Sequence, residues 1–158
     1  MSAPPPGGPA RPSPTALLFT GSPRLDAESA FARASRERLR ARLVAWLRRR
    51  VGGRRLHVFR VRRVSGEPAH VPEVHEIPIA AIVGTVEPSR AGLFDGCFRP
   101  ARAARDRWER IWLAEHRGVQ LPPISVMRVR GGYAVRDGHH RVSVARARGA
   151  TTIDAVVD

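Results

Sequence analysis

The chain has 158 residues, of which 42% are hydrophobic and 27% charged, and this is the size of one compact domain. All 28 basic residues are arginine and lysine is absent, which excludes a P-loop ATPase because that site needs a lysine on the phosphates. Cys97 is the only cysteine, so an intramolecular disulfide, a thiolate zinc site and CxxC redox chemistry are excluded. The formal charge of +14 favours anionic partners.

The location follows from the same features. No apolar run approaches the roughly 18 residues that a membrane span needs, and the N-terminus lacks the apolar segment of a signal peptide. We therefore expect a soluble, cytoplasmic protein without a membrane partner. The chain is also rich in alanine, glycine and proline, which is the codon bias of a GC-rich genome. Because this bias also raises the arginine content, we do not take the positive charge by itself as evidence of DNA binding.

The first third of the chain contains a tail and a basic segment. Residues 1–25 hold seven prolines and three glycines, a composition that predicts a disordered tail. From Asp26 as N-cap to Gly52-Gly53 as stop, the pattern predicts a basic amphipathic helix over residues 26–53. Residues 31–63 contain 13 arginines and one glutamate, a local charge of 13 − 1 = +12. The predicted apolar stripe of the helix is Ala32, Leu39, Leu43, Trp46 and Leu47.

The middle of the chain predicts short strands and a second helix. Residues 56–64 are β-branched and aromatic enough for a strand, and residues 77–83 predict an edge strand because Pro78 lies inside it. Pro100 begins a helix over residues 100–117 that Gly118 ends. Trp108, Ile111 and Trp112 share one face of this helix, which is typical of core residues.

The last forty residues predict a strand, a strand, a helix and a strand. Residues 124–130 and 133–136 form a hairpin whose turn is Gly131-Gly132, since both glycines accept positive φ. A helix over residues 139–148 ends at Gly149 and leads into a strand over residues 152–157.

The residues with the clearest chemistry lie where the hairpin meets this helix, in Asp137-Gly138-His139-His140-Arg141. A helix N-terminus presents unpaired N–H groups and a partial positive charge. Gly138 lets a phosphate approach the backbone, and Arg141 can bind it bidentately. The alternatives are that Asp137 simply N-caps the helix with the other side chains as surface or filler, or that zinc binds. The zinc ligands would be His139 and His140 with His70 or His75.

Several spaced motifs resemble the ParB/sulfiredoxin superfamily. They are residues 118–124, residues 132–135, the Asp-Gly-His-His-Arg turn, Ala145-Arg146 and Gly149, preceded by Ile77-Pro78-Ile79, Ile82, Glu87-Pro88-Ser89-Arg90 and Phe94-Asp95. The resemblance covers residues 75–158. It implies a small α+β fold with a mixed sheet, and it says nothing about residues 1–60. Together with the chain pattern, it predicts a domain over residues 54–158 that is preceded by the long basic helix. It also implies a strand-to-helix turn that binds nucleotide phosphates, as for CTP in ParB proteins, ATP in sulfiredoxins and an adenine nucleotide in the free-serine kinases.

Departures from these patterns limit what is carried over. His139 stands where sulfiredoxins have their catalytic cysteine, so repair of sulfinic acid is not expected. Gly138-His139-His140-Arg141 replaces the Gly-Glu-Arg-Arg of ParB, whose acidic residue is associated with CTP and metal. The turn looks most similar to that of the kinase-like members.

By that resemblance, Glu87 assists a hydroxyl nucleophile, Asp137 contacts a metal or a hydroxyl, and the phosphate-binding residues are Arg90, Gly138, His139, His140 and Arg141. The implied ligands are ATP, ADP or CTP, with Mg²⁺.

Two functions therefore follow from the sequence. The first is a ParB-like nucleotide-binding protein that uses the Gly-His-His-Arg turn, with phosphoryl transfer or nucleotide hydrolysis as its enzymatic form. The alternative is a non-enzymatic DNA-associated protein, similar to chromosome-partitioning proteins, that binds nucleic acid through the arginine-rich helix.

Overall fold

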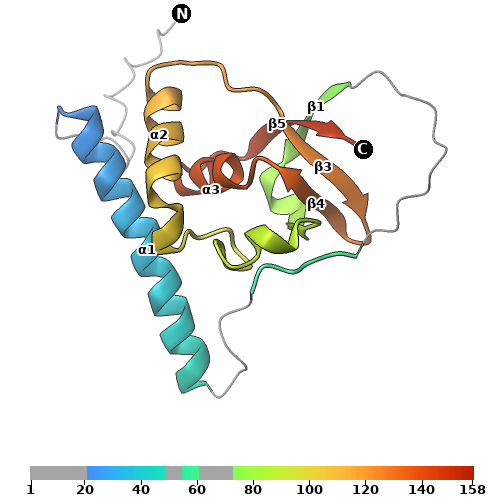
Figure 1. Cartoon of the computed structure of the whole chain (residues 1–158), viewed down its shortest axis with the longest axis horizontal. Coiled ribbons are helices and arrows are strands. Elements are labelled where there is room, and N and C mark those ends of the chain that lie inside the picture. The colour runs from blue at the N-terminus through green and yellow to red at the C-terminus, as the bar shows by residue number, and fades with distance from the viewer. Residues whose placement is uncertain (1–20, 49–54, 61–72) are drawn as a thin grey trace, which may run out of the picture.

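The fold combines a five-stranded mixed sheet with three helices (Figure 1). The computed structural model describes residues 21–48, 55–60 and 73–158. In chain order, its helices and strands are α1 (Pro23–Leu47), β1 (Val74–Pro78), β2 (Ile82–Thr85), α2 (Arg105–His116), β3 (Ile124–Val129), β4 (Gly132–Asp137), α3 (His139–Ala147) and β5 (Thr152–Val157). Short 3₁₀ turns are η2 (Ile79–Ala81), η3 (Pro88–Arg90) and η4 (Arg102–Ala104). The predicted α+β class is confirmed.

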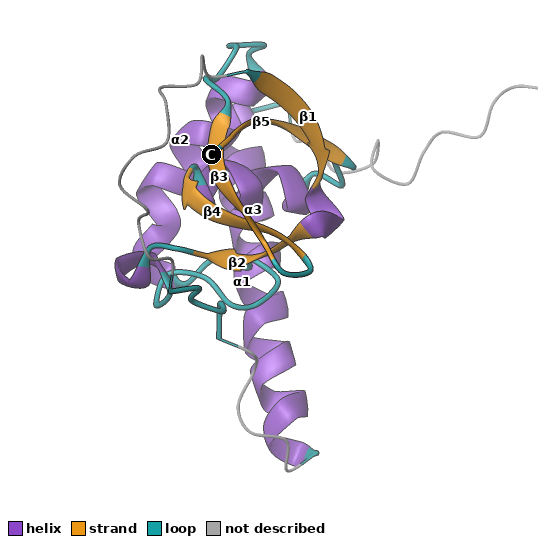
Figure 2. Ribbon diagram, turned by 90° about the vertical axis from the view of Figure 1, so that its right-hand side faces the viewer, coloured by secondary structure: helices purple, strands orange, loops and turns teal. Residues whose placement is uncertain are grey.

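The strand order is β1-β5-β3-β4-β2, which places the two halves of the predicted hairpin at the centre (Figure 2). β3 pairs with β4 and β1 with β5 in antiparallel fashion, whereas β5 is parallel to β3 and β2 is parallel to β4. Val129 pairs with Gly132, so the turn residues are Arg130 and Gly131 rather than the two predicted glycines. Both glycines have positive φ, at +90° and +149°, as expected.

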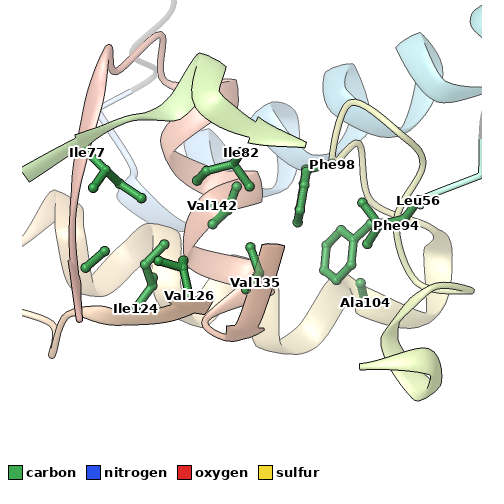
Figure 3. Packing of buried hydrophobic residues seen from close by; sticks show 11 residues of the cluster. Leu56, Ile77, Ile82, Phe94, Phe98, Ala104, Ile124, Val126, Val135 and Val142 are labelled. Carbon is green, nitrogen blue, oxygen red and sulfur yellow. The ribbon is translucent and has the colours of Figure 1, made fainter. Parts of the chain in front are cut away.

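The main core lies between the sheet and α3. Val142 of α3 packs against Ile124, Val126 and Val135 of the central strands (Figure 3). Phe94 and Phe98, from the segment before η4, extend this cluster. Trp108 of α2 donates a buried hydrogen bond from Nε1 to Ser143 Oγ at 2.9 Å, which ties α2 to α3. The predicted core role of Trp108 and Trp112 is confirmed.

Helix α1 differs from the prediction in its ends and in its buried face. It begins at Pro23, with Ser22 as N-cap and Asp26 buried within the first turn, and it ends at Leu47. The face that packs against α2 comes from the first half of the helix and consists of Ala27, Ala30, Phe31 and Ala34. The rest of the predicted stripe, Leu39, Leu43, Trp46 and Leu47, is exposed instead, with Trp46 at 72%, because the second half of α1 extends past α2 (Figure 1). Ala32, in the first half, is half-buried.

Other predicted boundaries shift or fall outside the described residues. The predicted tail lies outside the described part over residues 1–20, but its end was wrong, because residues 23–25 already belong to α1. The predicted helix stop, Gly52-Gly53, also lies outside the described residues. The predicted strand over residues 56–64 is not a strand where it is described, because Val58 makes one isolated bridge to Thr85 at the sheet edge. The predicted strand over residues 77–83 is two strands with η2 between them, and the second helix begins at Arg105 after η4.

Within residues 21–48, 55–60 and 73–158, no helix is long and apolar enough to cross a membrane.

Candidate functional site

The turn between β4 and α3 has the conformation that an anion site needs. Gly138 is the N-cap of α3, with φ +99° in the left-handed region and no side-chain cap. A Cβ at Gly138 would overlap Ile124 and lie 3.1 Å from Arg141 Nη2, so glycine is required by packing as well as by φ. The first N–H groups of α3 therefore have no capping side chain. The alternative that Asp137 N-caps the helix is wrong.

Six of the seven predicted site residues line one small cavity, which we call the anion cavity. These six are Arg90, Asp137, Gly138, His139, His140 and Arg141, and Arg107 and Ile111 of α2 complete the lining. Its volume is about 20 Å³, which admits about one water-sized group. With neutral imidazoles, three guanidinium groups and one carboxylate give the lining a charge of 3 − 1 = +2.

Arg141 is held at this cavity by Asp137. Its Nη2 donates to Asp137 Oδ2 at 3.2 Å, and the side chains of Arg141 and Asp137 are 12% and 69% exposed. Arg141 Nη1 is buried and has no hydrogen-bond partner among the described residues. A buried guanidinium donor without an acceptor is costly, and an incoming oxyanion is the group that would satisfy it. Burial also lowers the pKa of Arg141, whereas Asp137 opposes that shift.

The two histidines are buried, at 3% and 7% exposure. His139 Nε2 lies 2.7 Å from Thr85 Oγ1 and its ring stacks against Phe94. The His140 ring meets Phe94 edge to face at 5.1 Å. Burial lowers the pKa of each histidine to about 4, and Arg90 adds to the shift at both, with Arg107 acting on His140. A neutral imidazole has a single N–H to donate. Because Thr85 Oγ1 donates to Val135 O, the N–H of His139 is directed to Thr85, which leaves His140 as the histidine that can donate to an anion.

The structure separates Glu87 from the other predicted residues. Its side chain is exposed and does not line the anion cavity, whereas its backbone N–H donates to Thr85 Oγ1 at 2.8 Å. Arg107 and Ile111 were missed by the sequence analysis. They lie one helical turn apart on α2, but among 28 arginines no pattern distinguishes Arg107.

The zinc alternative gains no support from geometry. His75 lies on β1, 3.7 Å from Glu73, and His70 falls outside the described residues. In the described ranges, no group of three His, Cys, Asp or Glu side chains is close enough together to hold a metal.

No protein-family model and no curated protein sequence matches the chain. Among solved structures, the chain is similar to the sulfiredoxin from Arabidopsis thaliana, with a TM-score of 0.41 and 21% identity, over 55% of this chain and 85% of that chain. The α+β class rests on the strands and helices themselves, and membership of the ParB/sulfiredoxin superfamily stays a prediction.

Proposed function

We propose that the chain binds a nucleotide through its phosphates at the anion cavity. The observation that carries the proposal is that Arg141, whose buried Nη1 has no described partner, lines one cavity together with two other arginines and the uncapped N-terminus of α3. Each hydrogen bond from a charged donor to phosphate contributes roughly 1.5–3 kcal/mol. A small number of such bonds is sufficient for micromolar affinity.

The anion cavity is too small for a phosphate as it stands, so binding requires a side chain to move. Because it admits about one water-sized group, a phosphate enters only if a lining side chain moves, and we expect Arg141 to be that side chain. Arg141 would leave Asp137 and turn toward the phosphate, which frees the Asp137 carboxylate at the exposed mouth of the cavity. Ligand binding thus exchanges one anionic partner of Arg141 for another.

Phosphoryl transfer or hydrolysis is the enzymatic form of this proposal. Asp137, which lines the cavity, would contact either Mg²⁺ or an acceptor hydroxyl beside the phosphates. Mg²⁺ is commonly held by one or two carboxylates together with substrate phosphates, so the single carboxylate of Asp137 fits that mode. When bound, the ion would neutralise charge on the phosphates. Glu87 would reach only a substrate that extends beyond the cavity.

The test is a thermal-shift and calorimetric titration of the full chain with ATP, ADP, CTP and inorganic tripolyphosphate, with and without Mg²⁺. A ligand at one hundred times its Kd stabilises the protein by about 2.7 kcal/mol, which raises Tm by roughly 5–10 °C for this size. Arg141→Gln should abolish the shift. Arg130→Gln, which removes the same charge from the exposed hairpin turn, should retain it. Equal shifts in both variants, or no shift in the wild type, would refute the proposal.

A second candidate function is nucleic-acid binding through α1. Residues 33–48 contain six arginines and one glutamate, and five of these arginines are exposed: Arg33, Arg36, Arg40, Arg42 and Arg48. Such a surface binds backbone phosphates with a salt dependence of about −0.9 per neutralised phosphate in log K against log salt. Fluorescence anisotropy of a labelled duplex at two salt concentrations tests it. A combined Arg36→Gln, Arg40→Gln variant should reduce the slope by about two, and an unchanged slope would exclude α1 as the contact surface.

A further inference from the structure

The two histidines at the start of α3 differ in what their ring nitrogens contact. His139 Nε2 lies 2.7 Å from Thr85 Oγ1, and this hydroxyl donates to Val135 O at 3.0 Å. The N–H of His139 is therefore occupied by Thr85. The ring nitrogens of His140 make no hydrogen bond within the described residues, although this ring lines the anion cavity. His140 thus has a ring nitrogen available to a ligand, whereas His139 serves the packing of the turn.

The surroundings of His140 keep its imidazole neutral. Burial lowers its pKa to about 4, the nearby arginines add to that shift, and Asp137 opposes it. A neutral imidazole has one nitrogen with a proton and one with a lone pair, and its tautomer decides which of them faces the cavity. The lone pair can attack phosphorus without a separate base, which a serine or threonine hydroxyl would need.

The charges that would hold a phosphoryl group line the same cavity as this ring. They are the guanidinium groups of Arg90, Arg107 and Arg141, together with the uncapped N-terminus of α3. Phe94 meets the His140 ring edge to face at 5.1 Å, which restricts the rotation of the ring. Phosphoryl transfer depends mainly on positioning and on neutralisation of phosphate charge. The anion cavity offers both at His140.

We infer that His140 is the nucleophile of a two-step phosphoryl transfer and carries the phosphoryl group between donor and acceptor. This inference rests on the proposed function, because the donor is the nucleoside triphosphate bound at the anion cavity. In the first step, the lone pair of His140 attacks the terminal phosphorus and an N–P bond forms. The P–O bond to the nucleoside diphosphate breaks, and its electron pair leaves with that diphosphate. The other ring nitrogen keeps its proton, so the ring becomes cationic beside the phosphoryl oxygens.

The second step returns the ring to its starting state. Water or an acceptor hydroxyl attacks the same phosphorus, and the N–P bond breaks with its electron pair returning to the ring nitrogen. The proton of the attacking hydroxyl passes to solvent. Because burial and the neighbouring arginines disfavour a cationic imidazole, they favour this return to the neutral ring.

The test uses the full chain and whichever of ATP or CTP it binds more tightly, labelled in the terminal phosphate, with and without Mg²⁺. The protein should acquire label that is stable in alkali and lost in acid, as expected for a phosphorus–nitrogen bond. Tandem mass spectrometry should locate this label on His140. Without an acceptor, the protein should also exchange labelled nucleoside diphosphate into the triphosphate, because the first step is reversible. This exchange detects the phosphorylated ring even where it does not accumulate.

His140→Asn is the decisive variant, because it keeps a side-chain N–H donor but has no nitrogen lone pair to attack phosphorus. It should abolish the label and lower the exchange rate by about a thousandfold or more, while tripolyphosphate binding weakens by about tenfold at most. His75→Asn removes a half-exposed ring from β1 and is the control, which should label and exchange as the wild type does. If His140→Asn fails to fold or to bind, the location of the label in the wild type decides the question by itself.

The outcomes separate this inference from the proposed function. Label on a serine, an aspartate or His139 would refute it, as would exchange that survives in His140→Asn. If the wild type binds tripolyphosphate and a nucleoside triphosphate but shows neither label nor exchange, the phosphate site stands and the nucleophile is refuted. If the wild type binds neither ligand, the proposed function itself fails.

Discussion

Acidification should destabilise this protein through His139 and His140. Both imidazoles are nearly inaccessible, at 3% and 7% exposure, and burial holds their pKa values at about 4, compared with 6.5 for a solvated histidine. The folded pKa is therefore below the unfolded one, so the unfolded chain takes up protons first. The stabilisation is complete above pH 6.5 and is lost as the pH falls toward 4. At about 1.4 kcal/mol per pH unit, each histidine costs about 2 kcal/mol between pH 6.5 and pH 5, or about 4 kcal/mol for the pair.

Urea unfolding at pH 7, 6 and 5 measures this loss, in MES and acetate buffers without phosphate because a bound anion would stabilise the charged rings. His140→Asn should remove about 2 kcal/mol of the decrease, leaving a shallower dependence on pH. His75→Asn, which removes a half-exposed ring from β1, should leave the dependence as in the wild type. If wild type and His140→Asn lose the same free energy from pH 7 to pH 5, the reasoning is wrong.

Three further changes test how the turn and the helices are held. Gly138→Ala should lower the free energy of unfolding by about 2–4 kcal/mol in urea, because it adds left-handed strain and overlap with Ile124; a loss below 1 kcal/mol would contradict the packing. Thr85→Val should cost about 2 kcal/mol, since it leaves Val135 O and His139 Nε2 without their buried partner, while Thr85→Ser should retain most of the stability. Trp108→Phe should cost about 1–2 kcal/mol by orphaning Ser143 Oγ, and adding Ser143→Ala should recover part of it; the absence of any recovery would show that the hydrogen bond is not the cause.

The local part of the candidate site is predictable from sequence because it is contiguous. Asp137, His140 and Arg141 lie around one turn because β4 ends at Asp137 and α3 begins at His139, with only Gly138 between them. Arg90 lies far from this turn in the sequence, and it was assigned to the site only because its motif resembles that of the superfamily. Arg107 could not be found, because the face that α2 turns toward α3 depends on how Trp108 packs, and the surrounding arginines carry no periodic signal.

The protonation state of the site also depends on tertiary contacts. A pair of adjacent histidines at a helix start looks the same in sequence whether it is solvated or buried. Phe94 and Thr85, which lie more than forty residues earlier in the chain, cover these rings and make them neutral. Desolvation arises only when these segments pack together.

Local rules were enough to predict three elements from the sequence: the second helix with its tryptophan face, the hairpin with its positive-φ glycines, and the last strand, Thr152–Val157. It misplaced the buried face of α1, because periodicity identifies an apolar stripe without saying whether another element covers it. Ala27, Ala30, Phe31 and Ala34 are buried because α2 lies beside them, whereas Leu39, Leu43, Trp46 and Leu47 are exposed where α1 extends past α2. Burial is a property of two surfaces in contact, and only the tertiary structure supplies the second one.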